Sequence, residues 1–323
     1  MMRARDLVVV VTGASSGIGR AAAYAFADRR CALALAARRD AALDQVAQEC
    51  AARGGAAIAV ATDVSDAGAV DELARRALER YGRIDVWVNA AAVSAFGRFD
   101  DIPIEDFRRV LDINIMGYVH GARAALPVMR KQGRGVLINV SSIVGVVPQP
   151  YTHAYTMSKF AIRALSGSLR QELQVEGVRG VKVCTLLPPT VDTPLFQQAA
   201  NVTGRTVRAM PPVYPPERMA DAIVDLVRLP RREAAVGLVS RSLRMQSRLT
   251  PGLVEKLMAV QVDRMHLSSD KPAPASSGNL YHPAPGPGAV HGGWMRRGSQ
   301  LLRVPARAAL VFAAASVVSR RRR

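Results

Sequence analysis

The chain has 323 residues, 49% of them hydrophobic, which is enough for one large α/β domain or for one domain with an appendage. Its net charge of +18 is concentrated in the C-terminal third, where residues 228–323 contain 17 Lys and Arg against 4 Asp and Glu. No aromatic interleaving or groove-reading motif accompanies these arginines, and three cysteines cannot form a disulfide framework. Composition therefore excludes a disulfide-stapled domain. We expect no nucleic-acid partner and, because no metal-ligand spacing occurs, no bound metal.

Short apolar runs alternate with longer amphipathic stretches from residue 7 to about residue 240. The first run is too short for the core of a signal peptide, which favours a cytoplasmic protein. The runs predicted as strands span residues 7–11, 32–36, 57–61, 84–88, 135–141, 181–187 and 234–239. Helices are predicted over roughly 17–28, 40–53, 67–81, 104–131, 154–176 and 216–229. This alternation predicts a doubly wound α/β fold, with a parallel sheet of about seven strands covered by helices on both faces.

The alternation ends near residue 240, so we divide the chain into a catalytic domain, residues 1–240, and a C-terminal extension. Residues 241–267 are expected to form one or two helices. Residues 268–300, rich in Pro, Gly, Ser and His, are expected to form a poorly ordered linker. Residues 301–323 form an apolar tail that ends in four arginines. This tail fits an interfacial helix on an anionic membrane, a weak membrane anchor, or a disordered or core-packed basic tail.

Polar residues and a glycine follow the predicted strands at their carboxyl ends, where open parallel sheets bind ligands. They are Gly13, Arg38, Asp63, Asn89, Ser142, Thr190 and Thr193. Because such positions recur after six successive strands, they predict one site along a single edge of the sheet.

A glycine-rich segment, residues 12–19, follows the first strand and has the spacing G-x-x-x-G-x-G. Gly13 permits a tight turn, Gly17 lets backbone N–H groups approach a pyrophosphate, and Gly19 allows close packing of helix on strand. The other loop residues expected at the cofactor are Ser15, Ser16 and Ile18. The segment is therefore predicted to bind a dinucleotide, with an ordinary strand–helix turn as the alternative.

The second strand ends in Arg38 and Arg39, and no acidic residue occurs there before Asp40. An acidic residue at this place would bind a ribose 2′-hydroxyl, whereas arginine accommodates a 2′-phosphate. The two arginines therefore favour NADP(H) over NAD(H), with a solvated helix start as the alternative.

Tyr155 and Lys159 are spaced i, i+4, which places them on one face of a helix, and Ser142 precedes Tyr155 by thirteen residues. A free phenol has a pKa of about 10, and a nearby ammonium favours the phenolate and lowers that pKa. The Ser142 hydroxyl can hydrogen-bond the same substrate oxygen and fix its position. Together with the glycine loop, these residues predict proton transfer coupled to nicotinamide redox chemistry.

These motifs resemble the short-chain dehydrogenase/reductase family over about residues 6–240, which implies a Rossmann-type fold. The segments that carry the resemblance are residues 12–19, Asn139-Val140-Ser141-Ser142 with Gly145, residues 155–159, and residues 111–117 with Asn114. The resemblance implies that Tyr155 is the general acid/base and that Ser142 polarises and orients the substrate oxygen. It implies that Lys159 binds the nicotinamide ribose and lowers the tyrosine pKa, while Asn114 holds a water in the proton relay to Lys159.

The resemblance also implies the remaining cofactor contacts and a quaternary structure. Asp63 and Val64 would border the adenine, and Thr193 would meet the carboxamide. Further cofactor contacts are implied for Asn89, Tyr155, Lys159, Pro188, Thr190 and Val191. Members of the family commonly form dimers or tetramers through two long helices, here residues 104–131 and 154–176.

Two segments depart from the family pattern. The family's Asn-Asn-Ala-Gly reads Asn89-Ala90-Ala91-Ala92 here, which changes the packing around the cofactor. The family's Pro-Gly reads Pro188-Pro189, and the second proline removes a backbone N–H and fixes φ. Residues 195–215 stand where the family has its substrate lid, and their apolar side chains favour a lipophilic substrate.

We therefore expect an NADP(H)-dependent oxidoreductase that moves a hydride between the nicotinamide and a carbonyl or secondary alcohol carbon. The alternative is a low-turnover NADP(H)-binding protein that serves as a sensing or membrane-attached interaction module. Cofactor binding cannot distinguish the enzyme from this alternative, because both would bind NADP(H). Measurement of substrate turnover can.

Overall fold

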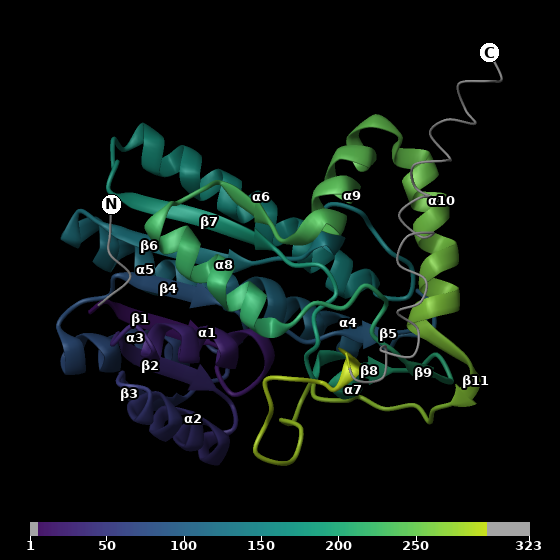
Figure 1. Ribbon diagram of the computed structural model, residues 1–323, viewed down its shortest axis with the longest axis horizontal. Helices are drawn as coiled ribbons and strands as arrows, with labels where there is room; N and C mark the ends of the chain where they lie inside the picture. The colour runs from purple at the N-terminus through teal and green to yellow at the C-terminus, as the bar shows by residue number, and fades with distance from the viewer. Residues whose placement is uncertain (1–5, 296–323) are drawn as a thin grey trace.

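The computed structural model describes residues 6–295 and is built around a seven-stranded parallel sheet (Figure 1). Its strands, in the order in which they lie side by side, are β10 (Glu233–Ala235), β7 (Val181–Leu187), β6 (Gly135–Val140), β4 (Val86–Asn89), β1 (Val8–Thr12), β2 (Ala32–Ala37) and β3 (Ala56–Ala61). The order along the chain reverses between β1 and β4, and ligands of such sheets bind at this switch point. The predicted doubly wound α/β fold is confirmed.

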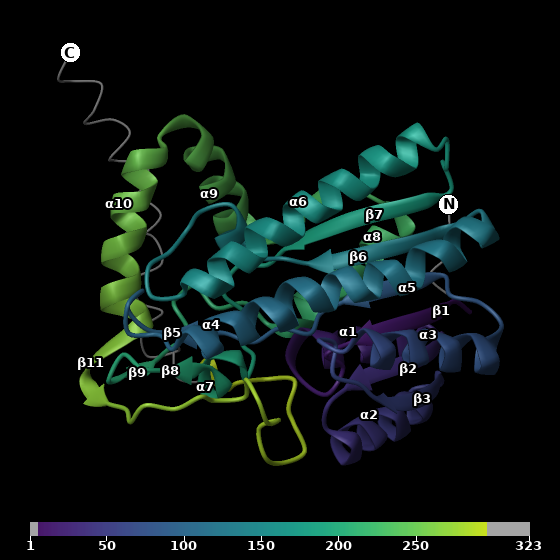
Figure 2. The ribbon, with the colours of Figure 1, turned by 180° about the vertical axis from the view of Figure 1, so that it is seen from behind.

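Helices cover both faces of the sheet. On one face lie α1 (Gly17–Ala27), α2 (Asp40–Ala52) and α8 (Pro216–Arg228), as Figure 1 shows. On the other lie α3 (Ala67–Tyr81), α5 (Gly117–Gln132) and α6 (His153–Val175), which Figure 2 shows from behind. Alternate residues of β1 enter different cores, with Val9 and Val11 on the first side and Val10 on the second. Burial on both faces explains why the strands are continuous apolar runs.

Two predicted elements differ from the structure. The predicted strand 234–239 is wrong beyond Ala235, because Gly237 adopts a φ of 82° and starts helix α9 (Gly237–Leu249). The predicted helix 104–131 is instead two helices, α4 (Ile104–Leu111) and α5, joined by a π-helical turn over Asp112–Met116.

The side chain of Asn114 holds this π-helical turn in place. Its Oδ1 accepts a hydrogen bond from the Val93 N–H and its Nδ2 donates one to the Val93 carbonyl, each at 2.9 Å. The Asn114 amide therefore binds both backbone polar groups of Val93 and links the loop after β4 to the π-helical turn.

The C-terminal extension lies beyond the carboxyl ends of the strands (Figure 1). Helix α9 is followed by α10 (Pro251–Gln261), because Pro251 cannot continue a helix but can start one. A second π-helical turn, Val262–His266, leads to β11 (Leu267–Pro272), which pairs antiparallel with β9 (Arg205–Val207). Short elements from the predicted lid, α7 (Leu195–Gln198) and β8 (Ala200–Asn201), lie near by, and β8 pairs with β5 (Ala95–Phe96). The division of the chain at residue 240 stays a prediction.

The expectation of a poorly ordered linker over 268–300 is wrong for residues 268–295. We call residues 276–295 the strap, and it runs along the carboxyl end of the sheet (Figure 1, yellow). The backbone of Ser276 exchanges hydrogen bonds of 2.8 and 3.0 Å with Asn201, and the Leu280 side chain is fully buried in the core. The strap lacks helix or strand periodicity, but several of its backbone polar groups bind residues that precede residue 240.

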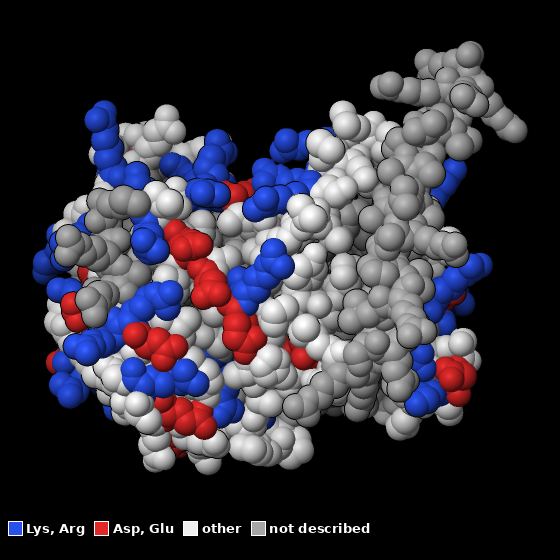
Figure 3. Space-filling view, in the orientation of Figure 1, with Lys and Arg blue, Asp and Glu red and all other residues white. Residues whose placement is uncertain are grey.

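Positive and negative side chains are interspersed on the face that carries α1, α2 and α8 (Figure 3). Within residues 6–295, no helix combines the length and the hydropathy that crossing a membrane requires. The predicted membrane-binding tail, residues 301–323, lies outside the described residues.

Candidate active site

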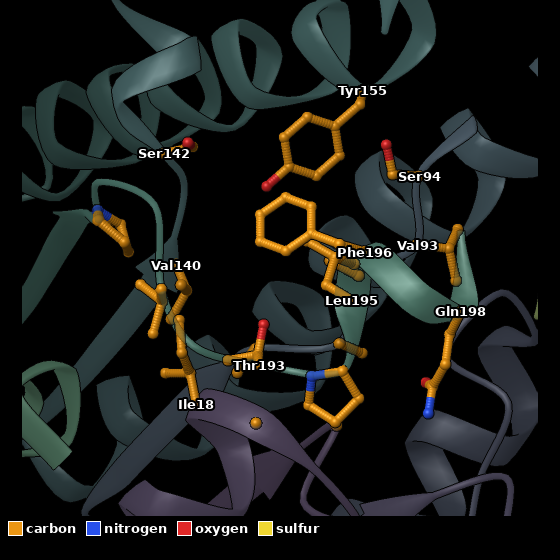
Figure 4. Close-up of a pocket in the computed structure, with 18 of the residues that line it drawn as sticks. Ile18, Val93, Ser94, Val140, Ser142, Tyr155, Thr193, Leu195, Phe196 and Gln198 are labelled. Atoms are coloured by element: carbon orange, nitrogen blue, oxygen red, sulfur yellow. The ribbon is translucent and has the colours of Figure 1, made fainter. Parts of the chain in front are cut away.

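The predicted functional residues meet in one cavity beyond the carboxyl ends of β1, β4, β6 and β7 (Figure 4). Ile18 and Thr193 lie on one side of it, and Ser142 and Tyr155 on the other. Every predicted cofactor-binding residue lines this cavity except Asn89, and every predicted catalytic residue except Asn114. The topology therefore gathers into one site residues that are far apart in the sequence.

The glycine loop packs too closely for side chains at two positions. A Cβ on Gly13 would lie 2.8 Å from the Ala91 backbone, and one on Gly19 would lie 2.3 Å from the Gly13 carbonyl oxygen. Ser16 makes no side-chain cap at the start of α1, so it does not compete for the helix N–H groups. The Gly17 N–H donates to the Ala289 carbonyl, and the other N–H groups of this first turn, together with the helix dipole, attract an anion.

The alanines after β4 are held by the neighbouring strand. The Thr12 hydroxyl accepts hydrogen bonds from the N–H groups of Ala90 at 3.2 Å and Ala91 at 3.4 Å. The family's second amide is therefore not needed to fix this loop. Asn89 itself points into the core, where its Oδ1 accepts from Trp87 Nε1 at 2.8 Å and its Nδ2 donates to Asn139 Oδ1 at 2.9 Å.

Charged side chains gather at the end of the cavity that would receive the adenosine. Arg38 and Arg39 line it beside Asp63, whose Oδ2 lies 2.6 Å from Arg109 Nη2. Burial alone would raise the pKa of Asp63, but hydrogen bonds from Ser65 and Arg109 outweigh it and hold this pKa below its usual value. Arg109 thus fixes an acceptor at a position predicted to border the adenine.

The loop after β7 forms the opposite wall. Pro188, Thr190, Val191 and Thr193 all line the cavity, and a Cβ on Gly17 would lie 3.1 Å from Thr193 Cγ2. The two loops therefore approach each other closely across the cavity. Pro189 lines the cavity as well, so the departure from the family pattern leaves this loop at the site.

Ser142 and Tyr155 direct their hydroxyl groups into the same space (Figure 4). Ser142 follows β6 and caps a short 3₁₀ helix, accepting a hydrogen bond from the Val144 N–H at 3.1 Å. Tyr155 lies in the first turn of α6. An oxygen atom of a substrate placed between the two hydroxyls could accept a hydrogen bond from each.

Lys159 lies behind Tyr155, one helical turn away, and is 1% exposed. Its Nζ donates a hydrogen bond to the Val140 carbonyl at 3.1 Å and lies 5.2 Å from the centre of the Tyr155 ring. Burial lowers the pKa of Lys159 to about 7. Burial also raises the pKa of Tyr155 to about 12, and the nearby Ser142 hydroxyl opposes this rise. The lowering of this pKa by Lys159, which the resemblance implies, is not seen in this structure.

Asn114 is buried one layer below the cavity. Both N–H groups of its amide are in use, since Nδ2 donates to the Val93 carbonyl and, at 3.1 Å, to Ser158 Oγ. Its side chain therefore positions the loop after β4 and the start of α6. A water held by this residue would therefore have to donate to one of its oxygen atoms, because no amide N–H is left to donate to the water.

The remaining wall of the cavity is apolar and comes partly from the C-terminal extension. Phe196 stands directly beside Tyr155, with Leu195 next to it (Figure 4). Leu243 of α9 and Met258 of α10 complete this wall. No periodic pattern in the sequence indicated that helices beyond residue 240 would reach the site.

His266 is a cavity residue that sequence reasoning missed. Its Nδ1 contacts the Arg208 carbonyl, and because a carbonyl only accepts, this nitrogen carries the proton. The ring packs edge-on against Phe96 and Phe196, with centroids 5.0 and 5.3 Å away. Burial lowers the pKa of His266 to about 4, so the ring is neutral near neutral pH. A single histidine far from the motifs carries no signal that could have identified it.

Comparisons with known proteins agree with this geometry. The model of the short chain dehydrogenase family matches residues 7–202. An uncharacterized oxidoreductase, YxnA of Bacillus subtilis, is 35% identical over 306 residues, which cover 92% of this chain and 84% of that protein. The probable oxidoreductase EphD of Mycobacterium tuberculosis is 35% identical over 275 residues, covering 80% of this chain and 45% of that protein.

Two solved structures are similar as well. An alcohol dehydrogenase from the archaeon Thermococcus sibiricus, complexed with 5-hydroxy-NADP, has a TM-score of 0.63 and 30% identity, and the match covers 71% of this chain and 95% of that one. A short chain dehydrogenase/reductase from Burkholderia phymatum, in complex with NAD, has a TM-score of 0.72 and 26% identity, covering 79% of this chain and 97% of that one.

Proposed function

This chain belongs to the short-chain dehydrogenase family of oxidoreductases, and from that premise we propose that it moves a hydride between NADP(H) and a lipophilic carbonyl or secondary alcohol compound. The observation that carries the proposal is the shared cavity, in which the Ser142 and Tyr155 hydroxyls face the glycine loop and Thr193. The apolar wall around Phe196 supports a lipophilic substrate.

The residues fit a dinucleotide. Gly13 and Gly19 allow the close backbone packing that shapes the glycine loop, and the start of α1, where no side chain caps the N–H groups, suits a pyrophosphate. A bound nicotinamide would supply the hydride in reduction and accept it in oxidation. Lys159 would contact the nicotinamide ribose, and Thr193 the carboxamide.

The proton would move through Tyr155. In reduction its O–H gives a proton to the substrate oxygen as the carbonyl carbon receives the hydride, and Ser142 holds that oxygen in place. Because burial raises the pKa of Tyr155, the phenol is protonated near neutral pH, as a proton donor must be. Lys159, with a pKa near 7, can release and regain a proton at the pH of the reaction.

The test of this function is NADPH oxidation with a panel of aldehydes, ketones, quinones, steroids and long-chain carbonyl compounds. We expect turnover with the native chain and a loss of at least about a hundredfold in Tyr155→Phe, because the phenyl ring has no proton to give. Tyr81→Phe, at the end of α3, is the matched control and should keep full activity. NADPH binding without turnover of any compound would contradict the proposal and favour a sensing or interaction module.

The preference for NADP(H) rests on Arg38 and Arg39, since the two structural relatives contain cofactors of both kinds. We expect Arg38→Asp to weaken NADPH binding at least about tenfold more than NADH binding, because an aspartate repels a 2′-phosphate but can accept from a 2′-hydroxyl. Titration of protein fluorescence with each cofactor measures the ratio of the two dissociation constants. Arg98→Asp, which changes the charge at an exposed site, should leave that ratio unchanged, and an unchanged ratio in Arg38→Asp would refute the assignment.

A further inference from the structure

The strap crosses the cofactor side of the cavity and contacts both loops that border it. On the glycine loop, the Gly17 N–H donates to the Ala289 carbonyl at 2.9 Å. On the loop after β7, the Trp294 N–H donates to Asp192 Oδ1 at 2.7 Å, and its Nε1 donates to the Thr193 carbonyl at 3.1 Å. The strap therefore bridges the gap between the two loops.

The strap also fixes both arginines at the adenosine end. Arg38 donates from Nη2 to the Asn279 carbonyl at 2.6 Å and from Nη1 to the carbonyls of Leu280 and Tyr281 at 3.0 and 3.4 Å. A guanidinium has five N–H donors, so these bonds leave Nε and one N–H of Nη2 available to a ligand. That edge of a guanidinium suits bidentate binding of a phosphate.

Arg39 is held in the same way. Its Nη1 donates to the carbonyls of Ala284 and Gly286 at 3.1 and 3.3 Å, and its Nη2 donates to Ser15 Oγ at 3.3 Å. Nε and one N–H of Nη2 again remain for a ligand. Both side chains are thus fixed in position while keeping part of their hydrogen-bonding capacity.

The strap binds the arginines without neutralising them. Residues 276–295 contain no Asp, Glu, Lys or Arg, so their contacts with Arg38 and Arg39 are with neutral carbonyl groups. A segment that mimicked a phosphate and displaced the cofactor would be expected to present carboxylates. Neutral carbonyls leave the positive charge of both arginines to attract an anion.

The cavity continues beneath the strap. Asn279, Pro283 and Ala284 line it together with the glycine loop, so the strap forms its outer wall. Three prolines, at 283, 285 and 287, restrict the backbone of this wall.

We propose that the strap is part of the cofactor site: it closes over the bound dinucleotide and holds Arg38 and Arg39 ready for the 2′-phosphate. This inference rests on the proposed function for the identity of the cofactor. It assigns a binding role to residues 276–295, which lie beyond the part of the chain that matches the family model.

Two glycines of the strap provide a matched pair of variants in the full-length chain. Gly288 and Gly286 both have positive φ, 73° and 88°, so alanine adds similar backbone strain at each. A Cβ at Gly288 would lie 2.3 Å from the Ser15 carbonyl oxygen and 2.8 Å from Arg39 Nη2, so it disturbs both the glycine loop and Arg39, whereas a Cβ at Gly286 would meet nothing within 4 Å. Gly288→Ala therefore pushes the strap away from the glycine loop, and Gly286→Ala does not.

The measurement is the dissociation rate of NADPH by stopped-flow fluorescence, with the dissociation constant from titration. We expect Gly288→Ala to raise the dissociation rate at least about tenfold and Gly286→Ala to change it less than about twofold. Gly292→Ala, whose Cβ would lie 2.3 Å from the Thr193 carbonyl oxygen, should repeat the effect at the other end of the strap; its control is Gly293→Ala, which strains the backbone at a φ of 76° but meets nothing within 4 Å. Equal rates in each pair would overturn the proposal, and tighter NADPH binding in Gly288→Ala would show that the strap competes with the cofactor instead.

The results of these binding measurements can be distinguished from a failure of the proposed enzymatic function. Binding is measured without turnover, so a protein that binds NADPH but reduces nothing leaves the strap proposal intact. If NADH dissociation rises as much as NADPH dissociation, the strap covers the cofactor, but it does not serve the 2′-phosphate. Thermal unfolding of each variant separates loss of binding from loss of fold.

Discussion

Lys159 is the residue whose burial conflicts most with its charge. It is 1% exposed, and its Nζ has one protein acceptor, the Val140 carbonyl, in the described part of the chain. Desolvation of this ammonium costs more than one hydrogen bond and the contacts with the Tyr118 and Tyr155 rings return, so its charge destabilises the folded chain. A buried lysine that lowers the stability of the fold is typical of a functional site.

This conflict predicts a pH-dependent gain in stability for Lys159→Met. Burial lowers the pKa of Lys159 to about 7, and an unfolded lysine has a pKa of about 10.4. Between these values the unfolded chain binds more protons, so the free energy of unfolding rises with pH there, and the cost of Lys159 is full below pH 7. We expect Lys159→Met to be more stable than the native chain by about 1–2 kcal/mol at pH 6, after the loss of the Val140 bond, and less so at pH 9.

Urea denaturation at the two pH values measures this difference. Lys182→Met, at an exposed position of β7, is the control and should show no such pH dependence. A Lys159→Met variant that is less stable at pH 6 than at pH 9, relative to the native chain, would contradict the argument. NADPH-dependent turnover should be lost in Lys159→Met at both pH values.

The sequence could predict the cavity residues that belong to spaced motifs. Ser142, Tyr155 and Lys159 lie together because helical spacing and a strand end determine their positions. Asn89 could not be placed in the same way, since its side chain binds Trp87 of the same strand, Asn139 of β6 and the Tyr118 carbonyl of α5. His266 was missed because its place at the cavity depends on the path of the C-terminal extension.

At the scale of elements, close contact between helix and sheet depends on single glycines. A Cβ on Gly121 of α5 would lie 2.2 Å from Asn89 Oδ1 and 2.7 Å from Trp87 Nε1. Gly167 of α6 is also within a helix, but a Cβ there would meet nothing closer than Arg170 Nη2 at 3.8 Å. Alanine would gain the same helix propensity at both positions, but only at Gly121 would its Cβ clash with neighbouring atoms.

Alanine at these positions should have opposite effects. We expect Gly121→Ala to destabilise the fold by about 1–3 kcal/mol through overpacking, and Gly167→Ala to stabilise it by about 0.5–1 kcal/mol through helix propensity. Chemical denaturation gives both free energies of unfolding. Stabilisation of both variants would show that helix propensity, and not the contact with β4, governs the effect at Gly121.

The regular elements were predictable because buried strands and amphipathic helices leave a pattern in the sequence. The break in the helix at Asp112–Met116 leaves none, since it depends on the pairing of Asn114 with Val93. The strap could not be predicted for a similar reason. Its contacts run from backbone carbonyls to distant arginines, and a Pro- and Gly-rich composition describes a packed loop as well as a disordered one.

At the scale of the whole molecule, one face of the sheet carries exposed apolar side chains. Met157 and Phe160 of α6 are 51% and 38% exposed, and Ile104 of α4 and Met116 of the adjoining π-helical turn are 57% and 42% exposed. These elements lie on the face shown in Figure 2. Apolar side chains gathered on neighbouring helices are typical of contacts between proteins.

We predict that the native chain is a dimer or tetramer through this face, as the family resemblance implies. Phe160→Glu should convert it to a monomer at micromolar concentration, because the association would bury an unpaired carboxylate. Leu229→Glu, at an exposed position just after α8 on the other face, should leave the oligomer intact. Light scattering after size-exclusion chromatography measures the mass of each. The prediction is contradicted if the native chain is a monomer, or if Phe160→Glu leaves the oligomer unchanged. The four exposed apolar side chains would then form a contact with a molecule other than a second copy of this chain.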